Sequence, residues 1–202
     1  MTLPFRFFAL ALLCTFYAPV TIAAQNLSDP DAKEIAAYRL TMDRFNKVVN
    51  VNRAFVKVMM QDPKVQEAMR IEAELQALGK KEEPTEADTK RIEELEARKD
   101  ALDESIDNPL GGDATTLAEM EARLRKYPPM QQALQREGMT TREYATFWMA
   151  FIQAAFAHGF QKSGMLKELP AGVNPENVKF VADHEADIQA MQKEFEALAR
   201  QK

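Results

Sequence analysis

Apolar residues recur three and four positions apart along most of the chain, and no stretch alternates steadily between apolar and polar residues. The first pattern places apolar side chains on one face of an α-helix, whereas a half-buried strand needs the second. Prolines stand where several of these segments begin and glycines where several end, which suits the first turn of a helix and its C-terminal cap. The pattern predicts an all-α fold, a single-domain bundle of about six to seven helices without a sheet.

The first half of the chain contains one long amphipathic segment and two highly charged ones. We expect a helix from about Pro30 to Gln61, with Asn52 standing in its stripe where an apolar residue is expected. Helices at about 63–78 and 90–107 carry thin apolar stripes among many charged residues. Because such helices are solvated on most sides and packed on one, the two are predicted to form a charged antiparallel hairpin.

Proline and glycine divide the second half of the chain into shorter segments. The stretch 108–113 contains one proline and two glycines, and it is the best candidate for a hinge. Short helices are expected at about 116–126 and just before Gly138. One last helix is expected to run from Pro175 to the C-terminus, since asparagine followed by proline is a favoured helix start.

The most apolar segment of the expected domain covers residues 144–160. Thr140 and Glu143 form a capping-box pattern just before it, because the side chain of each can accept a hydrogen bond from a free backbone N–H at the start of a helix. Large side chains go around most of this helix rather than along one stripe: Tyr144, Phe147, Trp148, Phe151, Ile152, Phe156 and Phe160. A helix of this kind belongs at the centre of a bundle.

The first two dozen residues differ from the rest of the chain. Arg6 precedes a mostly apolar run at 7–20, and small residues at 21–24 lead into polar sequence. A positive charge, an apolar run and small residues in this order are the marks of a cleavable secretory signal. We therefore expect a signal peptide at 1–24, a helical domain over 25–202, and a periplasmic or secreted location.

Two alternatives to a cleaved signal fit the residues less well. A membrane anchor needs roughly 20 apolar residues, and Pro19 interrupts the end of a shorter run. A lipid-modified cysteine would follow a small residue, but Leu13 precedes Cys14. Cleavage after 1–24 removes the only cysteine, and the loss of Arg6 changes the net charge from −5 to −6. We expect no membrane span after cleavage and no nucleic-acid partner, since nucleic-acid binding needs a basic surface.

Residues with candidate chemistry are few, and most of them are also good core residues. His158 lies on the aromatic helix, where it is either a ligand-binding group or a buried neutral imidazole with one hydrogen bond. Phe147, Phe151 and Phe156 are core in the simplest interpretation, but the wall of a pocket for a hydrophobic small molecule would look the same. These four residues form the candidate ligand-binding set.

His184 and Asp187 are a further pair with ligand spacing, since residues three apart share a helical face. A zinc or iron site needs more ligands, and the expected mature chain has only one other histidine and no cysteine to supply them. The chain contains no phosphate-binding loop, no nucleophile elbow and no paired-histidine zinc motif. We therefore expect no catalytic residue, no metal and no cofactor.

Two stretches of the C-terminal part resemble a known group of proteins. They are Met139-Thr140-Thr141-Arg142-Glu143-Tyr144 and Leu169-Pro170-Ala171-Gly172-Val173-Asn174-Pro175-Glu176-Asn177-Val178. Together with the Ala- and aromatic-rich helix between them, they resemble uncharacterised secreted helical proteins of Gram-negative bacteria. The resemblance covers about a third of the expected mature chain, and it implies an exported helical protein with no activity to carry over.

These observations favour an exported, non-enzymatic helical protein of the cell envelope that binds another protein. The absence of site chemistry and the charged amphipathic helices both point to that class. The alternative is a carrier of a hydrophobic small molecule beside Phe147, Phe151 and Phe156. A metal-dependent enzyme that uses His184 is the least favoured hypothesis.

Overall fold

The structure, a computed structural model, describes residues 29–81, 83–105 and 116–200. Within these residues all regular structure is α-helical and no strand is present, which confirms the predicted all-α bundle. Their helices are α2 (Pro30–Ala37), α3 (Met42–Met59), α4 (Pro63–Gly79), α5 (Glu86–Ser105), α6 (Leu117–Arg125), α7 (Pro128–Arg136), α8 (Thr141–Lys162), α9 (Pro175–Asp183) and α10 (Glu185–Arg200). The predicted signal peptide at 1–24 and the predicted hinge at 108–113 lie outside the described residues.

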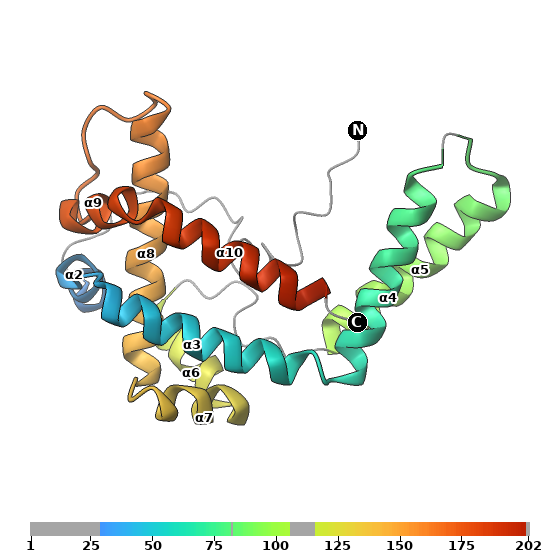
Figure 1. Cartoon of the computed structure of the whole chain (residues 1–202), viewed down its shortest axis with the longest axis horizontal. Helices are drawn as coiled ribbons and strands as arrows, with labels where there is room; N and C mark the ends of the chain where they lie inside the picture. Colours follow the sequence, from blue (N-terminus) through green and yellow to red (C-terminus); the bar gives the residue numbers. More distant parts are fainter. Residues whose placement is uncertain (1–28, 82, 106–115, 201–202) are drawn as a thin grey trace.

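Seven of the described helices form a body around α8, the aromatic helix. α8 packs against α2, α6, α7 and α9, while α3 and α10 lie side by side across the body (Figure 1). One continuous hydrophobic core takes side chains from all seven of these helices. The N-terminal half of α8 buries side chains on every side, which accounts for its lack of a single apolar stripe.

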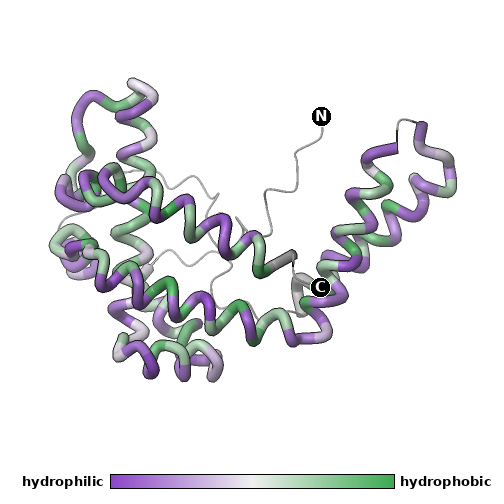
Figure 2. Tube along the Cα trace, in the orientation of Figure 1, coloured by the Kyte–Doolittle hydropathy of each residue, from purple (hydrophilic) through white to green (hydrophobic). Residues whose placement is uncertain are grey.

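Helices α4 and α5 form the predicted charged hairpin, which projects from this body (Figure 1). Their buried apolar side chains, Val65, Ala68, Ile71 and Leu95, lie outside the hydrophobic core of the body. Figure 2 shows hydrophilic residues along much of both hairpin helices, with hydrophobic residues at intervals between them. The hairpin thus has a small core of its own.

The predicted single helix from Pro30 to Gln61 is wrong, because the chain is extended around residues 38–41 and divides it into α2 and α3. Thr41 is the N-cap of α3, and its hydroxyl accepts a hydrogen bond of 3.3 Å from the Arg44 N–H. An N-cap threonine is extended by preference, so Thr41 starts α3, while α2 has already ended at Ala37.

Two asparagines at the start of α9 occupy this break. The side chain of Asn177 accepts a hydrogen bond from the Leu40 N–H (2.9 Å) and donates one to the Tyr38 carbonyl (2.8 Å). Asn174 donates to the same carbonyl at 3.2 Å. Buried backbone N–H and C=O groups at a helix break lack helical hydrogen bonds and need other partners. The side chains of these two asparagines provide them.

The predicted single last helix is also wrong, since α9 and α10 meet at His184. The backbone of His184 leaves helical geometry (φ −113°, ψ 25°), and its N–H donates to the Phe180 carbonyl. α9 packs against α8, whereas α10 packs along α3, and one straight helix could not follow both surfaces. Tertiary packing therefore places a bend where the sequence has neither glycine nor proline.

Candidate functional site

The aromatic residues of the candidate ligand-binding set lie on two different sides of α8. Phe147 and Phe151 are core residues, 1% and 5% exposed, and their rings stack at a centroid distance of 5.9 Å. Phe156 is 40% exposed and stacks instead on Phe160, one turn later, at 6.2 Å. The structure therefore brings Phe147 and Phe151 together and separates Phe156 from them.

His158, the fourth residue of the set, is partly buried on α8. Its Nε2 atom is buried and, within the described part of the chain, has no hydrogen-bond partner. Close to it along α8, Lys162 donates two hydrogen bonds to Glu185 at the start of α10 (2.8 and 3.0 Å), and these bonds lower the pKa of Glu185. These contacts fix the C-terminal half of α8 against the corner where α9 meets α10.

A buried polar pair joins α3 to α8. The Tyr144 hydroxyl donates a hydrogen bond of 2.5 Å to the Oδ1 atom of Asn52, and both side chains are almost completely buried. Burial raises the pKa of Tyr144 well above its ordinary value, so the hydroxyl keeps its proton and remains a donor. Asn52, which interrupts the apolar stripe in the sequence, is thus the acceptor that this buried hydroxyl requires.

The spacing of His184 and Asp187 does bring their side chains together. The Nδ1 atom of His184 lies 3.1 Å from the Oδ2 atom of Asp187, and the imidazole packs 4.6 Å from the ring of Phe180. In the described ranges, no group of three or more histidine, cysteine, aspartate or glutamate residues is arranged to hold a metal ion. The pair instead links the end of α9 to the first turn of α10.

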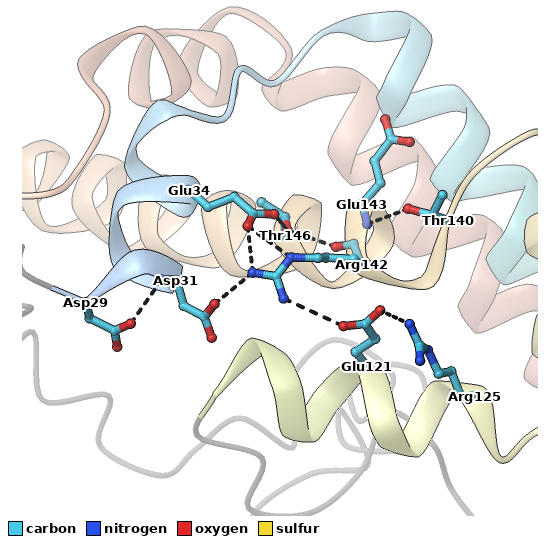
Figure 3. Close-up of polar contacts among 9 residues, drawn as sticks. All are labelled: Asp29, Asp31, Glu34, Glu121, Arg125, Thr140, Arg142, Glu143 and Thr146. Carbon is cyan, nitrogen blue, oxygen red and sulfur yellow. Dashed lines mark hydrogen bonds and ion pairs between the residues drawn. The ribbon is translucent and has the colours of Figure 1, made fainter.

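Sequence reasoning missed a charged cluster at the start of α8, which we call the Arg142 clasp (Figure 3). It consists of Arg142, Asp31 and Glu34 of α2, and Glu121 of α6. Nη2 of Arg142 lies 2.7 Å from Asp31 and 2.6 Å from Glu34. Its Nη1 lies 3.6 Å from Glu121. The clasp therefore connects three helices at one corner of the body.

The guanidinium group of the Arg142 clasp is occupied by the protein's own carboxylates. Hydrogen bonds to Glu34 and Asp31 raise the pKa of Arg142 further above its ordinary value, so its charge is permanent. The carboxylates also offset the unfavourable position of a cation in the first turn of a helix. The Thr146 hydroxyl lies 3.0 Å from Glu34 and extends the network. This arrangement suits a structural connection rather than an anion-binding site.

Ion pairs align the two helices of the projecting hairpin. Three cations of α5 each meet a glutamate of α4: Arg91 with Glu74, Arg98 with Glu67, and Lys99 with Glu72. Exposed ion pairs contribute at most about 1 kcal/mol each to stability. Their main effect is therefore to specify how the two helices align, while the buried residues around Leu95 hold them together.

A capping box begins α5 at Glu86, earlier than the predicted residue 90. The Thr85 hydroxyl accepts a hydrogen bond from the Asp88 N–H (3.2 Å), and Asp88 accepts one from the Thr85 N–H (2.9 Å). The Lys81 ammonium group donates to Asp88 at 2.5 Å, and this bond, with those from Thr85, lowers the pKa of Asp88 to about 2. A threonine followed three residues later by an aspartate was the available sequence signal.

Comparisons with protein-family models, with curated proteins and with solved structures found no match to this chain.

Proposed function

We propose that the protein is an exported, non-enzymatic binding protein of the cell envelope, and that the α4–α5 hairpin is the element that contacts its partner. The observation that carries this proposal is the separate core of the hairpin. Val65, Ala68, Ile71 and Leu95 are buried in the two helices of the hairpin, which contact each other, and the core of the body takes its side chains from the other seven described helices. An arm that the body does not need for packing is best explained by a contact outside the body.

The outward face of α5 supports a protein contact. Four carboxylates lie along it, all exposed: Glu86, Glu93, Glu96 and Asp100. Their spacing puts Glu86, Glu93 and Asp100 on the side of α5 opposite Leu95 and Glu96 at the edge of that side. Among the described residues none of the four forms an ion pair. Unpaired charged groups on an exposed helix orient an approaching partner of opposite charge and raise the rate at which the two proteins associate.

A carrier of a hydrophobic small molecule has less support from the geometry. Phe147 and Phe151 fill space against each other in the core, and Phe156 faces solvent. A ligand cavity lined by all three would require their rings to face a common space. The binding of another protein therefore remains the function that we propose.

Site-specific photo-cross-linking of the full-length chain in its native host tests this function. A photoreactive amino acid replaces Glu93 or Glu96 on α5 in two variants, and Glu168 in the matched control. Glu168 is an exposed carboxylate in the loop after α8, outside the hairpin. We expect both α5 positions to give the same discrete heavier product, with one partner protein identified in it by mass spectrometry, and the Glu168 position not to give it.

A second set of variants separates contact from folding. One variant combines Glu86→Gln, Glu93→Gln and Glu96→Gln, and it carries the photoreactive residue at Thr89. These substitutions remove negative charge from α5 without removing any ion pair of the hairpin. Compared with the chain that keeps the three glutamates and carries the photoreactive residue at Thr89, we expect an unchanged melting temperature and a several-fold lower yield of the cross-linked product. The proposal is wrong if the α5 positions give no product, or if Glu168 gives the same product in equal yield.

A further inference from the structure

The hairpin leaves the body at a tight turn between α3 and α4, residues 60–62, which we call the elbow. Met60 still has helical backbone angles (φ −65°, ψ −14°), and the N–H groups of Gln61 and Asp62 donate back to the carbonyls of Val58 and Met59. Asp62 itself is extended (φ −70°, ψ 123°), and Pro63 is already the first residue of α4. The change of direction is therefore concentrated at Asp62.

Three features hold Asp62 in this extended conformation. Pro63 disfavours helical angles in the residue before it, because its ring clashes with the backbone N–H and Cβ of that residue. The Asp62 carboxylate caps α4, accepting a hydrogen bond of 2.8 Å from the Lys64 N–H. The Gln66 side chain then closes the elbow by donating to the Met60 carbonyl at 3.1 Å.

We propose that Asp62 and Pro63 form a fixed bracket that sets the direction of the hairpin relative to α3. Without them, the flanking sequences would continue as one helix, since Met59, Met60 and Gln61 are compatible with a helix and α4 follows directly. This inference deepens the proposed function, because an arm of fixed direction presents its outer face in one orientation. It concerns geometry alone, so its failure would leave the cross-linking result intact.

Distance measurements between two spin labels test the bracket in the full chain. Labels are attached through Asn46→Cys on α3 and Ala77→Cys on α4, both exposed, in a background with Cys14→Ser. A continuous helix would place these residues about 46 Å apart at 1.5 Å per residue. We expect one narrow distribution at a clearly shorter distance. We expect the double variant Asp62→Ala, Pro63→Ala to give a broader distribution that extends toward about 46 Å.

Pro175→Ala is the matched control, because Asn174 and Pro175 form the same cap-and-proline start on α9. It should leave the distance distribution unchanged. Circular dichroism establishes that each variant is folded, and Pro63→Ala alone provides a milder change should the double variant lose structure. A broad or multiple distribution in the unsubstituted protein would overturn the proposal. A narrow, unchanged distribution in the folded double variant, or in folded Pro63→Ala if the double variant loses structure, would do so as well.

Discussion

Replacing Phe151 with alanine is expected to lower the free energy of unfolding by about 3–5 kcal/mol. The ring is 5% exposed and lies against Phe147, Trp148 and Phe45 at centroid distances of 5.9, 5.7 and 6.4 Å. Its removal would leave a cavity between α8 and α3 that the surrounding rings cannot fill without moving. Urea unfolding followed by circular dichroism measures the change.

Phe156→Ala is the control for Phe151→Ala on the same helix. Phe156 is 40% exposed and contacts Phe160 rather than the core, so we expect a loss below about 1 kcal/mol. A large difference between the two variants assigns Phe151 to the core and separates it from Phe156. Similar losses for both variants would instead indicate one shared apolar environment, as a ligand carrier requires.

Asn177→Ala is the substitution with the second largest expected effect, a loss of about 2–4 kcal/mol in the free energy of unfolding. Asn177 is 2% exposed, and its amide satisfies the Leu40 N–H and the Tyr38 carbonyl at the break between α2 and α3. Alanine would leave the buried Leu40 N–H without a partner, and the carbonyl would keep only Asn174. Chemical denaturation gives the loss of stability.

Amide hydrogen exchange locates the effect of Asn177→Ala. Faster exchange should appear at Leu40 and in the first turn of α9, where the lost hydrogen bonds lie. Asn46→Ala serves as control, since Asn46 is exposed on α3, and it should change stability by less than about 0.5 kcal/mol. If Asn177→Ala is as mild as this control, the two side-chain hydrogen bonds do not hold the break.

Helix starts with a local signal could be predicted from the sequence. The Thr140 hydroxyl accepts a hydrogen bond from the Glu143 N–H (3.0 Å), and Asn174 caps α9 through the Glu176 N–H (2.9 Å). Asp62 and Pro63 start α4 in the same way. In each case a residue that prefers the cap stands directly beside the helix it begins, so no long-range contact is needed to find it.

The two breaks that the sequence did not predict depend on partners far along the chain. The α2–α3 break is held by Asn177, which lies 137 positions after Leu40. The bend at His184 arises because α9 and α10 follow different neighbours. A search for glycine and proline cannot find either one, although Thr41 offered a local N-cap signal for α3.

The candidate site shows the same limit. Aromatic density on α8 correctly indicated a core helix, but only packing could separate Phe151 from Phe156. The Arg142 clasp was invisible because Asp31 precedes Arg142 by 111 positions, and acidic residues occur throughout the sequence. Charges on helices can be counted from a sequence, whereas their partners depend on the fold.

The central claim is that the α4–α5 hairpin is an arm with its own core, and hydrogen exchange on a Leu95→Ala variant tests it most directly. Leu95 is buried in the hairpin and lies outside the core of the body. We predict faster amide exchange throughout α4 and α5, with the exchange of α3, α8 and α10 unchanged. If exchange accelerates equally in the body helices, the hairpin and the body share one core, and the claim is contradicted.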